Sequence, residues 1–395
     1  MIVVIPCYKE PELFQTIHSL FACDRGDFAV EIIIVVNSYK IDTVEIVDMN
    51  RSSYKQIEDF AKKHNTPSFF VTPILIENIP GHQTGAGIPR KLGMDEAIRH
   101  FNGDKSGIIV SLDADCLVEK NYLTEIYRNF KDYRLNSATI EFHHPVEHLD
   151  ASDPLRIATT NYEVYLRYYR QALEFCGYPY PYFTIGSAFA VTAETYLKVG
   201  GMGKHQSGED FYFLQKVFPL GKTRFIDTTC VYPAARVSDR VPFGTGPALQ
   251  KMLSENQLSK STYNLWAFVA LKAFFDRVDL FWEKGEKGEK GEAGEKGEAG
   301  EAGEIETRNP KLKTSVVVGG LHESLLLFLK EDGFSQKINE INRHTSSLPN
   351  FRKRFFNYFN AFKILKYLNF VHLAYFNFED AGEQYELLLQ IVAEQ

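Results

Sequence analysis

Short apolar runs alternate with amphipathic stretches along residues 1–217. The apolar runs are rich in β-branched side chains and end in polar or glycine-containing segments, which is typical of buried strands. They predict strands at Ile2–Pro6, Glu31–Val36, Phe69–Ile76, Ile108–Leu112, Ala138–Phe142 and Gly186–Val191. Apolar residues at helical spacing predict helices over Pro11–Phe21, Ser52–Lys63, Pro89–Phe101, Asn121–Phe130, Asp153–Phe175, Ala193–Val199 and Gly208–Val217. Because strands and helices alternate, the pattern predicts an α/β fold with a three-layer, mostly parallel sheet.

Three local features refine this pattern. Pro73 cannot donate to a strand ladder, so the strand that contains it is expected at a sheet edge or with a kink. Gly81–Gly87 predicts a glycine-containing loop ahead of a helix. Tyr178–Phe183 alternates tyrosine with proline and is therefore expected to form an aromatic loop.

The composition changes abruptly between residues 285 and 303, where glycine recurs at every third position and glutamate follows each glycine. This period is the collagen signature, but the run contains no proline, so a flexible linker is the preferred interpretation over a triple helix. The predicted organisation is an α/β domain at 1–245, a helical extension at 246–283, the repeat linker at 284–304 and a helical region at 305–395.

The helical region contains a basic, aromatic stretch. Residues 350–378 combine many Phe and Tyr with Arg352, Lys353, Arg354, Lys363 and Lys366. Such a stretch either lies on an anionic membrane surface or packs its aromatic face on its own domain, with the charges solvated. We expect the packed arrangement and keep peripheral membrane contact as the alternative.

Charge and cysteine content narrow the class of protein. The 395 residues carry a net charge of −7, which argues against a general nucleic-acid-binding protein. The five cysteines are scattered without a CxxC pair, so neither a zinc ribbon nor a disulfide framework is expected. The chain shows no basic segment ahead of its first apolar run and no apolar run approaching the roughly 20 residues of a membrane span. A cytoplasmic location is expected, with residues 350–378 as the part that would contact the inner face of the cell membrane.

Two carboxylates, Asp113 and Asp115, directly follow the apolar run Ile108–Leu112. Ligands of open α/β sheets bind beyond the carboxyl ends of the strands, where residues i and i+2 can converge on one ion. Carboxylates are hard oxygen ligands that suit Mg²⁺ or Mn²⁺ beside a diphosphate. The pair predicts a divalent-cation site, and the alternative is a strand that ends in an Asp-rich turn.

Four segments match one protein family in order and spacing over residues 1–240. They are Val-Val-Ile-Pro-Cys-Tyr-Lys-Glu (3–10), Asp-Ala-Asp (113–115), Gly-Ser-Ala-Phe-Ala-Val (186–191) and Gly-Gly-Met with Gly-Glu-Asp (200–210). On these residues the chain resembles the bacterial family 2 glycosyltransferases, which have a GT-A (Rossmann-like) fold. The resemblance implies transfer of a sugar, with inversion and with a divalent cation, from a nucleotide-diphosphate sugar to an acceptor hydroxyl in cell-surface glycan or polysaccharide biosynthesis. A UDP-sugar donor and a glycan or lipid-linked acceptor are expected.

The resemblance also implies roles for single residues. Asp210 would be the catalytic base that takes the acceptor proton, with Glu209 beside it, and Asp113 and Asp115 would hold the cation. His205 could supply a third metal ligand, but a lone histidine in a loop is more often simply solvated, and that is the preferred interpretation. The residues expected to contact the nucleotide sugar are Pro6, Tyr8, Glu10, Asn37, Arg90, Asp113, Ala114, Arg236 and Arg240. The residues expected to contact the acceptor are Tyr180, Tyr182 and Gly186, with Tyr178 in the same loop.

Each of these positions also has a purely structural explanation. Pro6 can end a strand, and acidic residues such as Glu10, Glu209 and Asp210 can complement the N-terminal dipole of a helix. The arginines can be solvated or ion-paired surface charges, and the tyrosines can simply pack the loop that carries them.

One departure from the family concerns the nucleotide. Many relatives have an Asp-Asp-Gly-Ser segment after the second strand, whereas this chain has Asn37-Ser38-Tyr39. Asn37 can hydrogen-bond a base edge but carries no charge, so the identity of the nucleotide is left open. The absence of a Gln-x-x-Arg-Trp segment argues against a processive synthase.

Two other functions remain as alternatives. A sugar nucleotidyltransferase would share the sheet, but that class has a Gly-rich loop with Arg and Lys after the first strand, where this chain has Pro-Cys-Tyr-Lys-Glu. A non-catalytic glycan-binding or scaffolding module would not need Asp113, Asp115 and Asp210 together.

Overall fold

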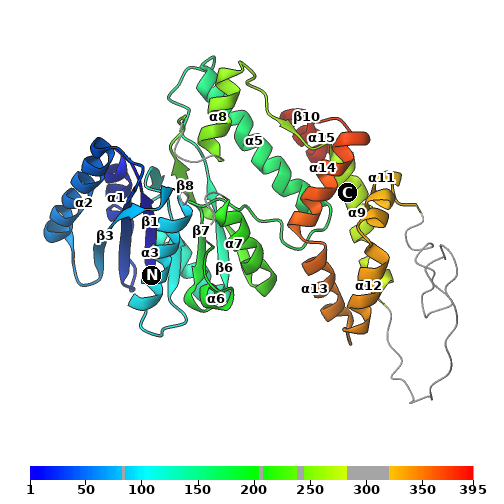
Figure 1. Ribbon diagram of the computed structural model, residues 1–395, viewed down its shortest axis with the longest axis horizontal. Coiled ribbons are helices and arrows are strands. Elements are labelled where there is room, and N and C mark those ends of the chain that lie inside the picture. Colours follow the sequence, from blue (N-terminus) through cyan, green and yellow to red (C-terminus); the bar gives the residue numbers. More distant parts are fainter. Residues whose placement is uncertain (82–84, 204–207, 238–243, 283–319, 395) are drawn as a thin grey trace. The chain divides into compact units, whose positions relative to one another are not determined.

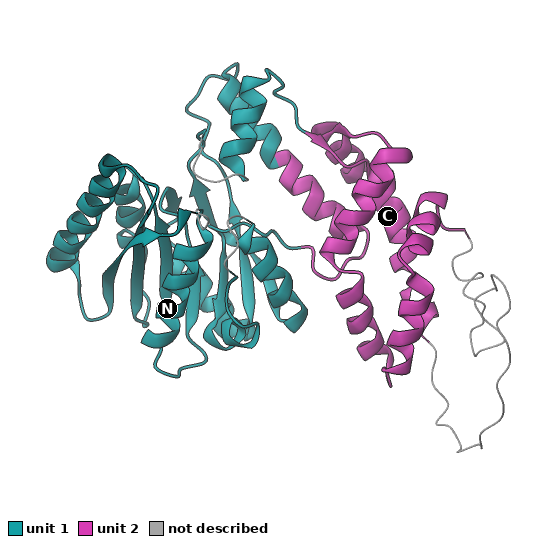
Figure 2. Cartoon of the chain, in the orientation of Figure 1, with its two compact units in different colours: residues 1–163, 182–260 teal, residues 164–181, 261–395 magenta. Residues whose placement is uncertain are grey.

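The computed structural model describes residues 1–81, 85–203, 208–237, 244–282 and 320–394. The chain forms two compact units (Figure 2), the first made of residues 1–163 and 182–260 and the second of residues 164–181 and 261–395. The predicted repeat linker at 284–304 lies outside the described residues. The first unit therefore extends beyond residue 245, and it excludes the second half of a long helix that was expected to belong to it.

Unit 1 is built on a sheet of eight strands in the order β3-β2-β1-β4-β7-β6-β8-β5 (Figure 1). The strands are β1 Ile2–Cys7, β2 Val30–Tyr39, β3 Phe69–Ile79, β4 Ile108–Ser111, β5 Cys116–Val118, β6 Ser137–Phe142, β7 Phe189–Thr192 and β8 Thr223–Pro233. The pairs β1–β2, β2–β3, β1–β4 and β6–β8 are parallel, and β7 and β5 run antiparallel to their neighbours. This confirms the predicted α/β class with a mostly parallel sheet.

Strand direction brings the ends of β1, β2 and β4, which carry several of the predicted site residues, to one edge of this sheet. Since β1 to β4, β6 and β8 all run in one direction, their carboxyl ends share an edge with the beginnings of β7 and β5. Ligands of such sheets bind at this edge. Pro73 lies in β3, which is an edge strand as expected.

Helices cover both faces of the sheet. The helices that belong to unit 1 are α1 Leu13–Phe21, α2 Val44–His64, α3 Gly87–His100, α4 Tyr122–Tyr133, α6 Ala193–Lys198, α7 Glu209–Val217 and α8 Thr245–Ser254, with a 3₁₀ turn η2 at Phe218–Leu220 and the first half of α5 Pro154–Phe175, on which α8 packs. Connections between parallel strands are right-handed. From β1 to β3 the chain moves towards one edge of the sheet, and after β3 it crosses back to β4 on the other side of β1. The helix of this return connection, α3, therefore covers the face opposite the one covered by α1 and α2. Gly93 allows α3 to approach closely, because a Cβ there would lie 2.5 Å from Val4 Cγ1.

Unit 2 is helical, as expected for the C-terminal region. It contains the second half of α5, then α9 Leu265–Phe275, η3 Val278–Phe281, α11 Glu323–Glu331, α12 Phe334–Arg343, α13 Leu348–Tyr358, α14 Ala361–Ala374 and α15 Ala381–Ala393, with a small pair of strands, β9 Ser261–Thr262 and β10 Glu379–Asp380. Phe274 lies at the centre of its core, with ring centroids 5.4 Å from Phe334, 5.7 Å from Phe355 and 5.1 Å from Phe359. Helices from both sides of the undescribed segment thus share one core.

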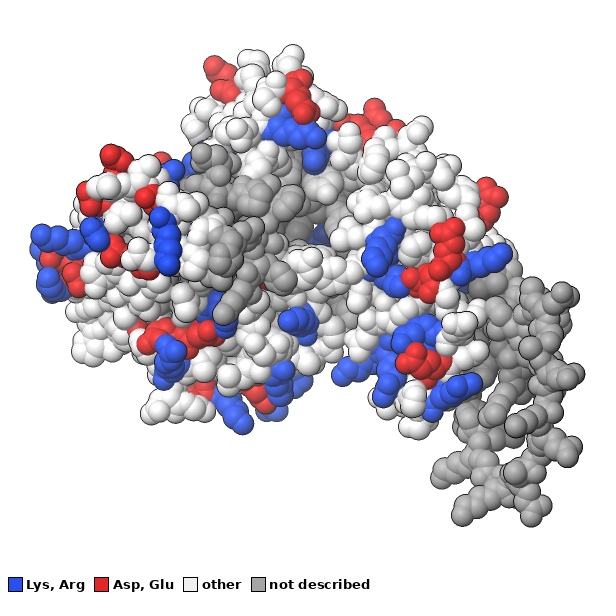
Figure 3. Space-filling view, viewed as in Figure 1, with Lys and Arg blue, Asp and Glu red and all other residues white. Residues whose placement is uncertain are grey.

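The basic, aromatic stretch 350–378 forms α13 and α14 and packs its apolar side inward. Phe351, Phe355 and Tyr367 are fully buried. Arg352 pairs with Asp279, and Lys363 pairs with Asp332. On the face of unit 2 seen in Figure 3, positive and negative side chains are interspersed. These contacts support the packed arrangement. None of the described helices has both the length and the apolar character that crossing a membrane requires.

Candidate active site

Arg90, in the first turn of α3, is the centre of a buried polar network at the carboxyl end of β4. Its side chain is 3% exposed. Nη1 donates to Ser111 Oγ at 2.8 Å and to the Gly186 carbonyl at 2.9 Å. Nη2 donates to Asp113 Oδ1 at 2.9 Å, and Nε donates to Glu209 Oε1 at 3.2 Å. One guanidinium therefore links α3, β4, the segment before β7 and the start of α7.

This network gives Arg90 a different environment from the phosphate contact that the sequence predicted. Burial on its own would lower the pKa of Arg90, but the carboxylates of Asp113, Glu209 and Asp210 raise it above the ordinary value. The guanidinium is thus charged and engaged with protein acceptors. Its phosphate role remains a prediction, and its position makes it an organiser of the carboxylates around it.

Gly186 lies directly against this network. A Cβ at this position would lie 2.8 Å from Arg90 Nη2 and 3.2 Å from Asp210 Oδ2. A real Cβ essentially never tolerates the first of these distances, and the buried arginine has no room to withdraw. This close approach explains why residue 186 is a glycine. Because Gly186 has no side chain, its backbone lies directly against Asp210 Oδ2.

Asp210, the predicted catalytic base, is buried and has a raised pKa. Burial and the neighbouring Glu209 carboxylate raise its pKa from 3.8 to about 7, partly offset by Arg90 and by a hydrogen bond from the Phe211 amide to Oδ1 at 2.7 Å. A carboxyl group with this pKa can accept a proton near neutral pH. The helix-dipole explanation alone would lower the pKa of an acid at the start of α7, so burial and charge repulsion dominate here.

The two aspartates of the predicted metal pair face different arginines. Asp113 pairs with Arg90, and its side chain is 38% exposed. Asp115 Oδ2 accepts from Arg236 Nη2 at 2.9 Å, and the same nitrogen pairs with Glu10 Oε2. Arg236 follows β8, and the Ala234 amide donates to the Asp115 carbonyl at 3.2 Å, which fixes this segment beside the aspartate.

The carboxylates of Asp113 and Asp115 can be compared with the ligands that a divalent cation requires. Among the described residues, no three His, Cys, Asp or Glu side chains are grouped to hold a metal ion. A Mg²⁺-type site, however, commonly uses one or two carboxylates and takes its other ligands from substrate phosphates and water. Asp113 and Asp115 fit that kind of site. The predicted third ligand, His205, lies outside the described residues.

Three residues predicted to contact the nucleotide lie in the last part of β1 or directly after it. Pro6 lies within β1 and pairs with Val35, beyond the part of β1 that β4 flanks, so it does not end the strand. Tyr8 Oη donates to Asp42 Oδ1 at 2.7 Å. Glu10 is buried, and Oε1 accepts from the Glu12 amide at 3.0 Å. The nucleotide contacts predicted for these residues remain predictions.

Two further nucleotide candidates are buried. Asn37 is fully buried at the end of β2, and its amide atoms have no hydrogen-bond partner of good geometry among the described residues. Ala114 is buried, and its carbonyl accepts from Thr16 Oγ1 at 2.8 Å. Arg240 lies outside the described residues.

The tyrosines predicted to contact the acceptor belong to two different units. Tyr178 is buried and packs against Phe275 and Phe356 in unit 2, and Tyr180 belongs to the same unit. Tyr182 belongs to unit 1 and donates to the Thr223 carbonyl at 3.0 Å. The packing explanation holds for Tyr178, and the acceptor roles of the other two remain predictions.

Two polar residues near the site were not among the predicted site residues. Ser111, the last residue of β4, donates to the Gly186 carbonyl at 2.6 Å. Tyr162 of α5 lies near Asp210, since burial and then that carboxylate raise the pKa of its phenol to about 12. The position of Ser111 in Ser-Leu-Asp, at the end of a predicted strand, could have indicated that it lies near the site. No neighbouring sequence pattern indicates this for Tyr162.

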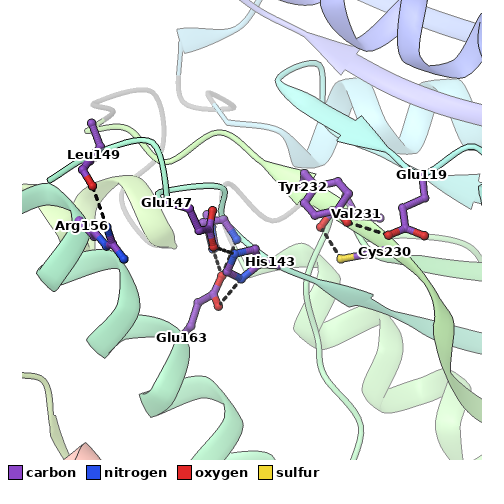
Figure 4. A network of polar contacts seen from close by, with 10 residues as sticks. Glu119, His143, Glu147, Leu149, Arg156, Glu163, Cys230, Val231 and Tyr232 are labelled. Carbon is purple, nitrogen blue, oxygen red and sulfur yellow. Dashed lines mark hydrogen bonds and ion pairs between the residues drawn. The ribbon is translucent and has the colours of Figure 1, made fainter. Parts of the chain in front are cut away.

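A second polar network lies at the carboxyl ends of β6 and β8 (Figure 4). Glu163 of α5 faces His143 Nδ1 at 3.2 Å and His144 Nδ1 at 2.7 Å, and His143 Nε2 pairs with Glu147. Nearby, Tyr232 Oη donates to Glu119 Oε1 at 2.7 Å. This network fixes α5 to the sheet edge that carries the site.

Comparisons with known proteins return only remote likenesses. No family model and no curated protein matches the chain. Residues 1–349 of S. aureus TarS in complex with UDP-GlcNAc are similar at 12% identity and a TM-score of 0.41, over 70% of this chain and 71% of that one. The mannosyltransferase PcManGT from Pyrobaculum calidifontis, in complex with GDP-Man and Mn²⁺, is similar at 14% identity and a TM-score of 0.42, over 94% and 85%.

The chain spans only part of some of these proteins. It covers 60% of another structure of TarS 1–349, at 13% identity and a TM-score of 0.38, and 42% of the longer TarS structure, at the same identity and score. The residues of the site, and not these likenesses, carry the function proposed below.

Proposed function

We propose that this protein is a glycosyltransferase that moves a sugar from a nucleotide-diphosphate sugar to an acceptor hydroxyl with inversion. The observation that carries the proposal is the arrangement around Arg90, which holds Asp113 and Glu209 and lies against Gly186, with Asp210 alongside. A carboxylate suited to a divalent cation and a carboxyl group suited to proton transfer at one sheet edge support the proposal. The motifs shared with family 2 glycosyltransferases occur at these same positions.

Asp210 is the catalytic base in this proposal. As the acceptor hydroxyl attacks the anomeric carbon from the face opposite the leaving nucleotide, its proton passes to a carboxylate oxygen of Asp210. The raised pKa makes Asp210 a stronger base than an ordinary aspartate while leaving it substantially ionised near neutral pH. Glu209, fixed by Arg90 Nε, holds the start of α7 in place.

The donor side of the site would neutralise the leaving nucleotide diphosphate. Asp113 and Asp115 would hold a Mg²⁺ or Mn²⁺ ion, which supplies positive charge to the diphosphate when bound. Arg236, beside Asp115, would supply a further positive charge to that diphosphate. Tyr8, Glu10 and Asn37 line the β1–β2 side, where the nucleoside would bind.

We place the reaction in the assembly of a cell-surface glycan, on a glycan or lipid-linked acceptor at the cytoplasmic side of the membrane. A sugar nucleotidyltransferase would need phosphate-binding groups after β1, whereas Tyr8 and Glu10 there are engaged with Asp42 and Arg236. That alternative has no contact in its favour among the described residues.

Thermal stabilisation by donors tests the proposal first. A ligand that binds only the folded state raises the melting temperature by mass action. UDP-, GDP- and dTDP-sugars would be added with Mn²⁺ and with a chelator, and one nucleotide class should raise Tm with Mn²⁺ and lose its effect in Asp115→Asn. If no nucleotide sugar shifts Tm of the parent protein, the proposed donor site is wrong.

A second variant separates donor binding from chemistry. Asp210→Asn should keep the donor-induced Tm shift and lose roughly 10²- to 10⁴-fold in the rate of sugar transfer, because the base has been removed. Transfer at the parent rate by Asp210→Asn would show that another group takes the acceptor proton.

A further inference from the structure

Arg236 occupies the position at which a cation would meet Asp115. Its Nη2 contacts both Glu10 and Asp115, and Nη1 lies 3.8 Å from Glu12 Oε2. These carboxylates come from the segment after β1 and from the loop after β4. Its guanidinium therefore serves as the counter-ion of carboxylates on two neighbouring strand ends.

The backbone fixes this position. β8 pairs with β5 from Cys116 to Val118, and the Ala234 amide then binds the Asp115 carbonyl. Arg236 lies two residues beyond that bond, so its side chain reaches Asp115 without any rearrangement of the sheet. Its Nε atom is buried and has no hydrogen-bond partner among the described residues, so the contact leaves one donor unused.

Charge balance indicates what happens when a donor arrives. Among the described residues, Arg236 contacts the carboxylates of Glu10 and Asp115, and Arg90 contacts those of Asp113 and Glu209. A diphosphate that enters beside these carboxylates is repelled by them, and a divalent cation that binds with it would offset that repulsion. A cation that binds Asp115 through Oδ2 competes with Arg236, because the guanidinium already occupies one acceptor site of that oxygen and its positive charge repels the ion.

We propose that Arg236 and a divalent cation exchange at Asp115. In the donor-free protein the guanidinium neutralises Glu10 and Asp115; when metal and donor bind, the Asp115 carboxylate changes partner, and the released guanidinium contacts the diphosphate. The inference rests on the proposed donor site, but the metal step can be measured without any donor.

The test is the affinity of the donor-free protein for Mn²⁺ alone, measured by calorimetry on the full chain. Arg236→Gln should bind Mn²⁺ about tenfold more tightly than the parent, because a partly exposed, charge-assisted contact no longer competes for Asp115. Arg236→Lys, which keeps a charge but loses the planar fork, should fall between the two. Asp115→Asn should remove the gain when it is combined with Arg236→Gln.

Arg51→Gln is the matched control. Arg51 is an exposed arginine of the same unit that pairs with Glu77. Its replacement should leave Mn²⁺ affinity within twofold of the parent. In contrast, donor affinity at saturating Mn²⁺ should weaken about tenfold in Arg236→Gln alone, because the released guanidinium is missing.

A second measurement needs only the parent protein. Methylglyoxal modification of Arg236, followed by mass spectrometry, should speed up severalfold when Mn²⁺ is added without nucleotide, because the guanidinium is then displaced from Asp115. The modification rate of Arg51 should stay constant.

The possible outcomes separate the two proposals. Equal or weaker Mn²⁺ affinity in Arg236→Gln, no Mn²⁺ binding by either protein, or an unchanged Arg236 modification rate would each overturn the exchange, even if nucleotide sugars bind and react. Tighter Mn²⁺ binding by Arg236→Gln without binding of any nucleotide sugar would uphold the exchange and reject the proposed donor site.

Discussion

At the scale of single residues, Arg90 shows how one buried charge can organise a site. A guanidinium that is 3% exposed is costly to bury unless its donors are satisfied, and here Ser111, Gly186, Asp113 and Glu209 accept from it. The same charge restrains the pKa of Asp210, which burial and Glu209 raise. The catalytic properties proposed for Asp210 therefore depend on a residue that need not touch the substrate.

The pKa of Asp210 leads to a prediction about pH. The base acts when ionised, so the transfer rate should fall about tenfold for each pH unit below its pKa of about 7. The residual rate of Asp210→Asn should lack this limb. Initial rates between pH 5 and 9 at saturating donor would check it, and a parent profile that is flat through pH 6 would contradict it.

The pKa of Asp210 also predicts how the free energy of unfolding depends on pH: it should fall as pH rises, whereas the transfer rate should increase. Because the folded protein holds the Asp210 proton more tightly than the unfolded chain, ionisation costs folding free energy as pH rises from 3.8 towards 7. Asp210→Asn removes that cost, so it should melt at a higher temperature than the parent at pH 8, with the difference shrinking towards pH 4. A variant that melts lower at pH 8 would rule out this linkage.

Gly186→Ala tests the close approach to Arg90 and Asp210. The added Cβ would lie 2.8 Å from Arg90 Nη2, and the ion pairs of that side chain oppose its withdrawal. Overpacking of this kind should cost about 1–3 kcal/mol of unfolding free energy, measured by urea denaturation, and should lower the transfer rate. Gly382→Ala is the control, since its nearest neighbour is the end of the Asp380 side chain and a helical alanine should be neutral or stabilising.

At the scale of elements, the local pattern of apolar residues was enough to predict most strands and helices. It did not predict strands that form only because they pair with a neighbouring strand. The apolar runs that predicted β1 to β4, β6 and β7 are present as strands. β8 was missed because Asp227, Thr228 and Thr229 interrupt its apolar residues, and its pairing with β6 contains a register shift. β5 has only three residues and exists through its pairing with β8.

The same limit applies to the site. The sequence indicated which acidic residues follow strand ends, because that depends on local order. It did not indicate that Arg90 would meet Glu209, 119 residues away, or that Arg236 would meet Asp115, 121 residues away. Such contacts are set by strand order across the sheet, which no local pattern encodes.

The attachment of α5 to β6 leads to an element-scale prediction. Burial opposes both shifts, but His144 lowers the pKa of Glu163, and the carboxylates of Glu147 and Glu163 raise that of His143. The Glu163 contribution to stability is present above pH 4.5 and is lost as pH falls through its lowered pKa. The His143 contribution is present below pH 6.5 and is lost as pH rises through its raised pKa.

Glu163→Gln should therefore lower Tm most between pH 4.5 and 6.5, where both groups are charged, and less at pH 9. His143→Gln should lose only the alkaline part of this dependence, since Glu163 still accepts from His144. Melting curves across this range would check both variants. An equal Tm loss for Glu163→Gln at every pH would mean that packing, and not charge, holds α5 to the sheet.

At the scale of the whole molecule, unit 2 is assembled from segments on both sides of residues 283–319. Phe274 packs on Phe334 and Phe355, and Asn342 Nδ2 donates to the Phe281 carbonyl at 2.9 Å. The Leu265 amide donates to Gln384 Oε1 at 2.7 Å. These contacts, together with the Arg352–Asp279 pair, join α9 and η3 to α12, α13 and α15 without using the intervening segment.

This arrangement predicts that the covalent connection through the glycine repeat is dispensable for the folded state. A protease site inserted between residues 285 and 303 should be cleavable in the native protein, and both fragments should elute together from a sizing column at the mass of one chain. The entropy cost of connecting two packed segments grows only slowly with the length of the connection between them. Cutting that connection should therefore lower Tm by a few degrees at most at micromolar protein concentration. Phe274→Ala should weaken the association of the cut fragments, because a buried aromatic side chain contributes about 3–5 kcal/mol. If the two fragments separate without any other change to the protein, the repeat and not the aromatic core holds unit 2 together. If the uncut protein elutes at three times the mass of one chain, the triple-helix interpretation of the repeat is restored.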